Sequence, residues 1–293
     1  HLLEELLSSD NEIVVFDNFL TGKKENVEFK GNFKLIEDDL GNKNSLNLIK
    51  EFNPQICFHL AAQSSVVVSV DDPLLDFEHN ILQPVQLIKT LLSTDCSKFV
   101  FASSGGTIFG EPSILPTGEE DFAGEPESPY GIGKKKLNEI ITSMTIDTHM
   151  SYSILNLSNV YGPRQDPHGE AGVVSIFSNK ILNNEKPIIY GDGEQTRDYI
   201  YVKDVVNALI LSSKIDSNLF LNIGTGIETS VNQLLETIKS EFASDVEPIY
   251  KESRKGELLR SVLNSSKAQK ELNWESQFSL NKGIKEVVSW LKT

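Results

Sequence analysis

The sequence predicts an α/β protein built on a doubly wound parallel β-sheet, followed by a smaller second lobe. Short apolar runs typical of buried strands alternate with amphipathic helical patterns from the start of the chain to about residue 161. After that point the alternation becomes less regular. We therefore expect a first domain over residues 1–161 and a second lobe over residues 162–293, with some later segments returning to the sheet.

The predicted elements follow from hydrophobic periodicity. Strands of the first domain are expected at residues 13–16, 33–40, 56–62 and 99–102 and, leading into a loop, at 151–163. Helices are expected at residues 1–7, 45–52, 74–92 and 128–141. In the second lobe we expect helices at 171–182, 202–214, 230–242 and 283–291, with strands near 187–193 and 219–226.

The chain opens inside the first of these helices, in which Leu2, Leu3, Leu6 and Leu7 form one apolar stripe. A doubly wound nucleotide-binding fold normally has a strand and a glycine-rich turn before this helix. Neither is present in the sequence. We therefore expect the residues that carry that turn to precede His1.

Composition limits the possible functions. The formal net charge is −15 and the pI about 4.8, which argues against binding to nucleic acid or to an anionic membrane surface. No apolar run reaches the roughly 18 residues of a membrane span, and no basic signal segment is present. Cys57 and Cys96 lack the spacing of a zinc site or a disulfide framework, and the histidines are scattered. We expect a cytoplasmic protein with reduced thiols and no metal.

Tyr130 stands four residues before Lys134 at the predicted start of a helix. Residues four apart share one helical face, so the ammonium group can approach the phenol. A phenol titrates near ~10 in water, and a nearby cation favours the phenolate, which can then act as acid and base near neutral pH. The same spacing also arises by chance at the start of an ordinary amphipathic helix.

Asp17 ends the second strand of such a fold, where an acidic residue binds the ribose hydroxyls of adenosine. A carboxylate there would repel a 2′-phosphate and so favours NAD over NADP. The alternative is an ordinary turn aspartate before Asn18.

Other polar residues gather at predicted strand exits on one edge of the sheet, where ligands bind in this architecture. They are Ser103 and Ser104, the pair Tyr130 and Lys134, and Asn159 with Tyr161. A hydroxyl beside the tyrosine could hold a substrate alcohol while the phenolate removes its proton and a nicotinamide takes the hydride.

The second lobe supplies cations that suit a diphosphate. These are Arg197, Arg254 and Arg260. The alternative for each of them is a surface salt bridge with one of the 42 carboxylates.

Nine segments together carry a resemblance to a known family. They are VVFDNFLTGKKENV, HLAAQSSVVVSVDDP, SSGGTIFGEP, SPYGIGK, NVYGPRQDPHGEAGVVSIF, YGDGEQTRDYIYVKDV, LNIGTG, KGELLRSVLN and KAQKELNW. The chain resembles the extended short-chain dehydrogenases/reductases of the NAD-dependent sugar-nucleotide epimerase/dehydratase group, most closely the UDP-glucose 4-epimerases. The resemblance implies a Rossmann-like NAD-binding first domain, a UDP-sugar-binding second lobe and a homodimer.

The resemblance also implies roles for the matching residues. Those implied to bind NAD are Asp17, Asn18, Asp39, Leu40, Ala61, Ala62, Gln63, Asn80, Ser103, Tyr130 and Lys134. Those implied to bind the UDP-sugar are Asn159, Val173, Arg197, Arg254, Glu257 and Ser261. Tyr130 would be the catalytic base and Lys134 its partner.

The chain departs from the family pattern in the loop after the 99–102 strand. The usual catalytic serine or threonine of the family is replaced by Gly105, so we expect Ser104 to take its role, with a water molecule as the alternative. The Asp-Glu pair of the dehydratases is absent there, and Gly105 and Gly106 argue against dehydration. Ser261 is small where a bulky residue would exclude an N-acetyl group, so UDP-GlcNAc and UDP-GalNAc join UDP-glucose and UDP-galactose as substrates to consider.

The resemblance implies 4-epimerisation of a UDP-hexose through a transient 4-keto sugar. Two alternatives remain open. One keeps the fold and changes the chemistry to that of a UDP-sugar decarboxylase, dehydratase or reductase. The other is a nucleotide-sensing protein without catalysis, against which the intact Tyr130 and Lys134 count.

Overall fold

The computed structural model describes the chain except for residues 29–30, 122–123, 168–171 and 254–257. Its central element is a parallel sheet with the strand order β10-β5-β4-β3. The strands are β3 (Ile56–His59), β4 (Lys98–Ser104), β5 (Ser151–Leu157) and β10 (Leu219–Ile223). A separate parallel pair is formed by β1 (Ile13–Asp17) and β2 (Phe33–Glu37), with Asp17 beside Glu37. Parallel strands joined through helices confirm the predicted α/β class.

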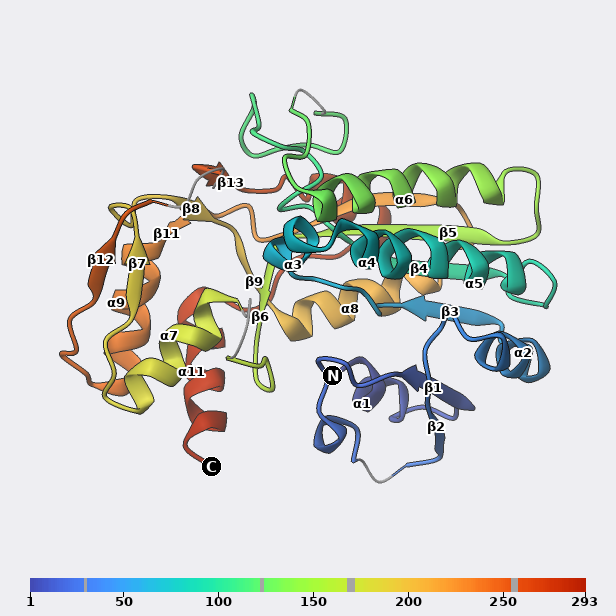
Figure 1. Ribbon diagram of the computed structural model, residues 1–293, viewed down its shortest axis with the longest axis horizontal. Helices are drawn as coiled ribbons and strands as arrows, with labels where there is room; N and C mark the ends of the chain where they lie inside the picture. Colours follow the sequence, from blue (N-terminus) through green and yellow to red (C-terminus); the bar gives the residue numbers. More distant parts are fainter. Residues whose placement is uncertain (29–30, 122–123, 168–171, 254–257) are drawn as a thin grey trace.

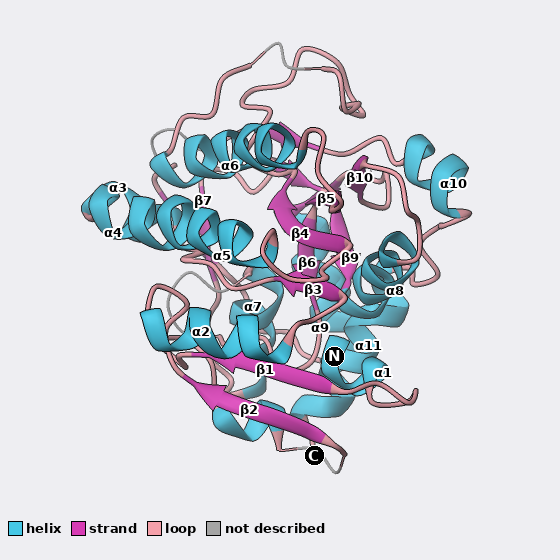
Figure 2. Ribbon diagram, turned by 90° about the vertical axis from the view of Figure 1, so that its right-hand side faces the viewer, coloured by secondary structure: helices cyan, strands magenta, loops and turns pink. Residues whose placement is uncertain are grey.

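Helices cover both faces of the central sheet (Figure 2). On one face α6 (Pro129–Thr145) packs on β4 and β5, and α5 (Gln83–Leu91) packs beside it. On the other face α8 (Val202–Ser213) contacts the same two strands. The remaining helices of this part are α1 (Leu2–Leu6), α2 (Lys43–Phe52), α3 (Val66–Asp71), α4 (Pro73–Phe77), η2 (Glu78–Leu82), α10 (Ser266–Leu272) and the 3-10 turn η1 (Lys24–Val27).

The predicted helix over residues 74–92 is divided in the structure. It consists of α4, the π-helical segment η2 and α5. Pro84 has no backbone N–H, and the N–H of Gln83 just before it bonds to the carbonyl of Glu78, five residues earlier. The loss of one donor in mid-helix explains the wider turn, which hydrophobic periodicity does not reveal.

The second lobe is a group of helices and short strands beyond the carboxyl end of β3 (Figure 1). Its helices are α7 (Val173–Leu182), α9 (Val231–Phe242) and α11 (Leu280–Leu291). Its strand pairs are β6 (Asn159–Tyr161) with β9 (Tyr199–Tyr201), β7 (Ile188–Tyr190) with β12 (Ile249–Lys251), and β8 (Thr196–Arg197) with both β11 (Thr229–Ser230) and β13 (Arg260–Ser261). β10 and α8 come from the same half of the sequence but lie at the central sheet.

The lobe has its own apolar core, which includes Tyr161, Phe177, Leu234 and Ile284. Gly283 lets α11 approach this core closely, because a Cβ at that position would lie 2.0 Å from the hydroxyl oxygen of Tyr161. Tyr161 is 2% exposed and donates to the carbonyl of Leu280. It therefore belongs to the lobe core, and its expected place among the polar groups at the sheet edge is wrong.

No helix in the part of the chain that the structure describes is both long and apolar enough to cross a membrane.

Candidate active site

Three polar side chains meet where β4 ends and α6 begins. Ser104 is the last residue of β4, whereas the sequence predicted it in a loop. Tyr130 and Lys134 lie in the first two turns of α6. The helix starts at this point because Ser128 caps it, accepting a 3.1 Å hydrogen bond from the N–H of Gly131, and because Pro129 fits the first helical position. The cap thus fixes the height of Tyr130 above the sheet edge.

Lys134 is a buried cation. Its side chain is 3% exposed and its Nζ donates a 3.4 Å hydrogen bond to the carbonyl of Ala102. The Nζ atom lies 4.8 Å from the centre of the Phe101 ring and 5.8 Å from that of Tyr130. Burial lowers the pKa of Lys134 to about 8, and the charge of Asp76 opposes this shift.

The phenol of Tyr130 behaves differently from the sequence prediction. Burial raises its pKa above the usual value, the charge of Asp76 raises it further, and an interaction with the side chain of Ser104 lowers it. The expectation that a nearby cation would dominate the pKa of Tyr130 is wrong, because desolvation of the phenolate outweighs the other effects. The side-chain hydroxyl of Ser104 nevertheless interacts with the phenol of Tyr130.

The ends of β1 and β2 lie together on the same side. Asn18 donates a 3.0 Å hydrogen bond to Oδ2 of Asp39, which joins the residues that follow the two strands. Oδ1 of Asp17 accepts a 2.7 Å bond from the N–H of Phe19, as a turn aspartate does. Leu40 packs into the core next to them. The structure therefore places Asp17, Asn18 and Asp39 within one small area.

A second group lies after β3. Ala61 is exposed and Ala62 half-buried, and Nε2 of Gln63 donates a 2.8 Å hydrogen bond to Oδ1 of Asp76 on α4. Nδ2 of Asn80 donates 2.8 Å hydrogen bonds to the carbonyl of Gln63 and to Oδ1 of Asp76. These contacts fix the loop after β3 against η2.

The predicted substrate residues lie on the second lobe and on the strands leading to it. Asn159 begins β6 with its side chain exposed, and Val173 begins α7. Arg197 of β8 and Ser261 of β13 are direct neighbours in a parallel pair, and Ser261 is 8% exposed. Arg254 and Glu257 lie outside the described residues. Arg260, which was a candidate for a diphosphate, forms an ion pair with Glu228.

The comparisons with known proteins cover almost the whole chain. A family model described as GDP-mannose 4,6 dehydratase matches residues 1–287. The chain belongs to the NAD-dependent epimerase/dehydratase family. A "Putative UDP-glucose 4-epimerase" of Methanocaldococcus jannaschii is 41% identical over 292 residues, covering 100% of this chain and 94% of that protein.

Solved structures of this family show the same fold. A UDP-glucose 4-epimerase of Thermotoga maritima, solved with UDP-glucose, is 39% identical with a TM-score of 0.96, covering 100% of this chain and 94% of that one. The UDP-glucose 4-epimerase of Thermus thermophilus, in complex with NAD, is 35% identical with a TM-score of 0.91, at the same coverage. They confirm the predicted extended short-chain dehydrogenase/reductase architecture.

The polar atoms at the sheet edge fit the NAD of this family. Oδ1 of Asn80 and Oγ of Ser103 are buried without a hydrogen-bond partner among the described residues. Buried polar atoms are normally satisfied, so these two call for a polar ligand. At the carboxyl end of β1, the carboxylate of Asp17 is of the type that accepts hydrogen bonds from ribose hydroxyls.

Two residues of this edge escaped the sequence analysis, His59 and Asp76. His59 ends β3 and is 3% exposed, and its ring stacks against those of Phe99 and Phe101 with centroid distances of 5.9 and 5.7 Å. Burial and the charge of Lys134 lower its pKa to about 3, so the ring is neutral. A lone histidine in an apolar strand gives no recognisable pattern, and only the tertiary fold brings it to Lys134.

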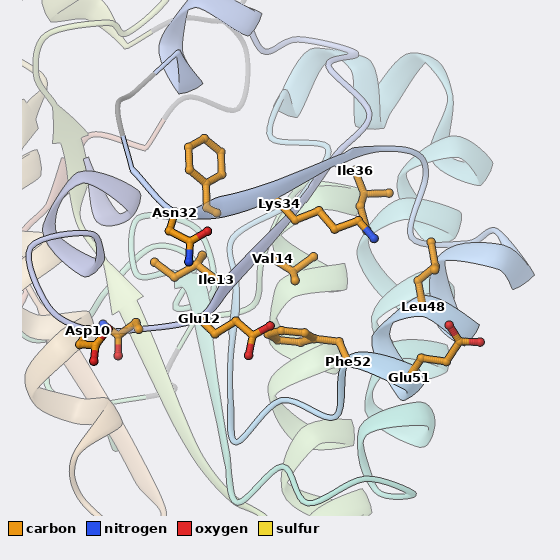
Figure 3. Close-up of a pocket in the computed structure, with 12 residues that line it drawn as sticks. Asp10, Glu12, Ile13, Val14, Asn32, Lys34, Ile36, Leu48, Glu51 and Phe52 are labelled. Atoms are coloured by element: carbon orange, nitrogen blue, oxygen red, sulfur yellow. The ribbon is translucent and has the colours of Figure 1, made fainter.

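One pocket that the described residues outline lies elsewhere. It has a volume of about 540 Å³ and opens at the amino ends of β1 and β2, against the end of α2 (Figure 3). Asp10, Glu12, Lys34 and Phe52 are among its lining residues. Parallel strands of this fold bind ligands at their carboxyl ends, where Asp17 and Asp39 lie. This pocket therefore does not belong to the candidate active site.

Proposed function

We propose that this protein is an NAD-dependent UDP-sugar 4-epimerase. The observation that carries the proposal is the meeting of Ser104, Tyr130 and Lys134 at the carboxyl end of β4, beside buried polar atoms that lack partners among the described residues. A phenol, a hydroxyl and a buried ammonium in one place are the groups needed to remove and return the proton of a secondary alcohol.

The residues act as follows in this proposal. Ser104 and Tyr130 hold the C4 hydroxyl of the hexose, and the phenolate of Tyr130 takes its proton. NAD, when bound, supplies the acceptor and donor of the C4 hydride. The positive charge of Lys134 stabilises the phenolate, and Tyr130 returns the proton once the 4-keto sugar presents its other face. Asp17, Asn18, Asp39, Asn80 and Ser103 would hold the cofactor, with Leu40, Ala61, Ala62 and Gln63 lining the same edge.

On the substrate side, Arg197 would bind the diphosphate, with Asn159 and Val173 along the nucleotide sugar. The sequence places Arg254 and Glu257 in this set as well. Ser261 lies beside Arg197 and has a small side chain, so we extend the proposed substrates to UDP-GlcNAc and UDP-GalNAc.

The experiment is an epimerisation assay followed by proton NMR. Full-length protein with NAD is expected to interconvert UDP-glucose and UDP-galactose, and Tyr130→Phe is expected to reduce kcat by about 10²-fold or more. The same assay with UDP-GlcNAc tests whether the small side chain of Ser261 admits an N-acetyl group. An unchanged C4 configuration in both sugars would refute the proposal, and release of carbon dioxide or a stable 4-keto product would assign the protein to another reaction of the family.

We further propose that the protein is a homodimer formed through α3, α4 and α6. Val67 and Val70 on α3 are 51 and 60% exposed, and Leu74 and Phe77 on α4 are 79 and 55% exposed. Ile132 on the neighbouring α6 is 48% exposed. Such a row of exposed apolar side chains is typical of an interface. Light scattering should give twice the chain mass, and the pair Val70→Lys with Leu74→Lys should give the monomer, while Ile227→Lys on the other lobe leaves the mass unchanged.

We also propose a cytoplasmic location, because Cys57 and Cys96 are free thiols that burial keeps protonated, with the pKa of Cys96 raised to about 11. Cell fractionation tests this location.

A further inference from the structure

Asp76 is a buried carboxylate on α4, close to the first turns of α6. It is 2% exposed, and α4 packs against α6. Carboxylates are rarely buried to this extent without a compensating charge. Neither the sequence motifs nor the proposed reaction assigns Asp76 a role.

The two oxygens of Asp76 have different surroundings. Oδ1 accepts 2.8 Å hydrogen bonds from Nε2 of Gln63 and from Nδ2 of Asn80. Oδ2 faces α6, since a Cβ placed on Gly133 would lie 3.4 Å from it. Gly133 directly precedes Lys134. Two neutral amides therefore fix the carboxylate while its other oxygen is directed at the helix that carries Tyr130 and Lys134.

Few charged or titratable groups of the described residues surround the carboxylate of Asp76. Lys134 and Tyr130 face Asp76 from α6, and His79 faces it from η2. His59 faces Lys134 from β3 and is neutral. On α3, Asp71 is exposed. Among the described residues, Asp76 is the one carboxylate whose charge acts on both Tyr130 and Lys134.

We propose that Asp76 is the counter-charge of Lys134 and a positioning residue that sets the pH range in which Tyr130 and Lys134 act. A buried ammonium bonded to one backbone carbonyl is costly to charge, and a fixed carboxylate nearby offsets part of that cost. The same negative charge disfavours the phenolate, so Asp76 moves both titrations in the same direction. The inference rests on the proposed epimerase function, whose acid–base pair it concerns.

The test replaces Asp76 by Asn, which keeps the shape and the Oδ1 acceptor and removes the charge. Without the carboxylate the pKa of Lys134 falls and the pKa of Tyr130 also falls. Activity needs the phenolate and the ammonium together, so both limbs of the pH profile of kcat should move to lower pH, by about 1 pH unit. These limbs report the coupled pair rather than either residue alone.

A second measurement does not depend on activity. Lysine labelled with ¹³C at Cε allows the titration of Lys134 to be followed by NMR, with its signal assigned by its absence in Lys134→Met. The midpoint should be lower in Asp76→Asn than in the unmodified protein. Asp76→Glu, which keeps the charge, should restore it. Should Asp76→Asn fail to fold, Asp76→Ser carries the same expectation.

Asp72→Asn is the matched control. Asp72 is the exposed N-cap residue of α4, the helix that carries Asp76, and its Oδ1 accepts a hydrogen bond from the N–H of Leu75. It should leave the midpoint and the profile unchanged. An unchanged Lys134 midpoint in Asp76→Asn overturns the inference, and so does an equal shift in Asp72→Asn. A shifted midpoint in a protein that epimerises no UDP-sugar would uphold the counter-charge and refute the proposed function.

Discussion

Asn156 of β5 donates a 3.0 Å hydrogen bond to Oδ1 of Asn222 of β10, and both side chains are fully buried. Nδ2 of Asn222 donates in turn to the carbonyl of Thr117, and its backbone N–H donates to Glu119. One amide side chain thus joins the strand that follows α6, the strand contributed by the second half of the sequence, and the loop after β4. Buried polar chains of this kind favour a single arrangement of the packed strands.

Asn222→Leu should therefore lower the free energy of unfolding. The substitution leaves Nδ2 of Asn156 without a partner in the interior, at about 1–3 kcal/mol for one unpaired group. It also removes one of the two hydrogen bonds to the carbonyl of Thr117, which still accepts from the N–H of Asn264. We expect a loss of roughly 2–4 kcal/mol in urea unfolding. Asn281→Leu on the exposed face of α11 is the control and should change the free energy of unfolding by less than about 0.5 kcal/mol. Equal values for the two variants would contradict this account.

Local patterns predicted the parts of the site that depend on neighbours in sequence. Tyr130 and Lys134 are four residues apart on one helix, and Asp17 ends an apolar run, so periodicity was enough to locate them. Asp76 and His59 could not be found in this way, since the packing of α4 against α6 and of β3 beside β4 determines their burial and charge environment. The direction of the Tyr130 pKa shift was missed for the same reason, because desolvation depends on the whole surrounding structure.

Asp17 should determine the choice between NAD and NADP if it accepts bonds from the adenosine ribose. Removing the carboxylate with Asp17→Ser takes away a charged acceptor and its repulsion of a 2′-phosphate. We expect NAD to bind about 10-fold more weakly and the preference for NAD over NADP to shrink, as measured by calorimetry. Asp10→Ser, just before the other end of the same strand, is the control. If Asp17 is only a turn residue, the variant will lose stability while the ratio of the two affinities stays the same.

The buried side chain of Lys98 should make the free energy of unfolding depend on pH. Its Nζ donates to the carbonyls of Tyr152, Ile215 and Ser217 at 3.2, 2.7 and 2.9 Å, which ties β4 and β5 to the segment after α8. Lys98→Met removes these three hydrogen bonds and should cost about 2–3 kcal/mol at pH 7. Lys89→Met, exposed near the end of α5, is the control.

The sign of the pH effect follows from the pKa of Lys98. Burial lowers it to about 8 in the folded protein from an ordinary value of 10.5. Between these values the unfolded chain binds more protons than the folded one, so the contribution of Lys98 to the free energy of unfolding rises with pH. The difference between the unmodified protein and Lys98→Met should therefore grow from about pH 8 to about pH 10.5. A difference that shrinks over this range would show that the folded lysine keeps its proton.

Ser104 and Ser103 allow the hydroxyl that assists Tyr130 to be identified. The Ser104 side chain lowers the pKa of Tyr130, whereas Oγ of Ser103 is buried without a partner among the described residues. Ser104→Ala should raise the pKa of the phenol, move the acid limb of the kcat profile to higher pH, and reduce kcat at pH 7 by roughly 10- to 100-fold, as expected for one hydrogen bond to a charged group. Ser103→Ala should weaken NAD binding and leave the acid limb in place.

Ser103 and Ser104 are adjacent on β4, so a general disturbance of this strand would affect both variants alike. A shift of the acid limb in Ser103→Ala alone would assign the assisting hydroxyl to Ser103.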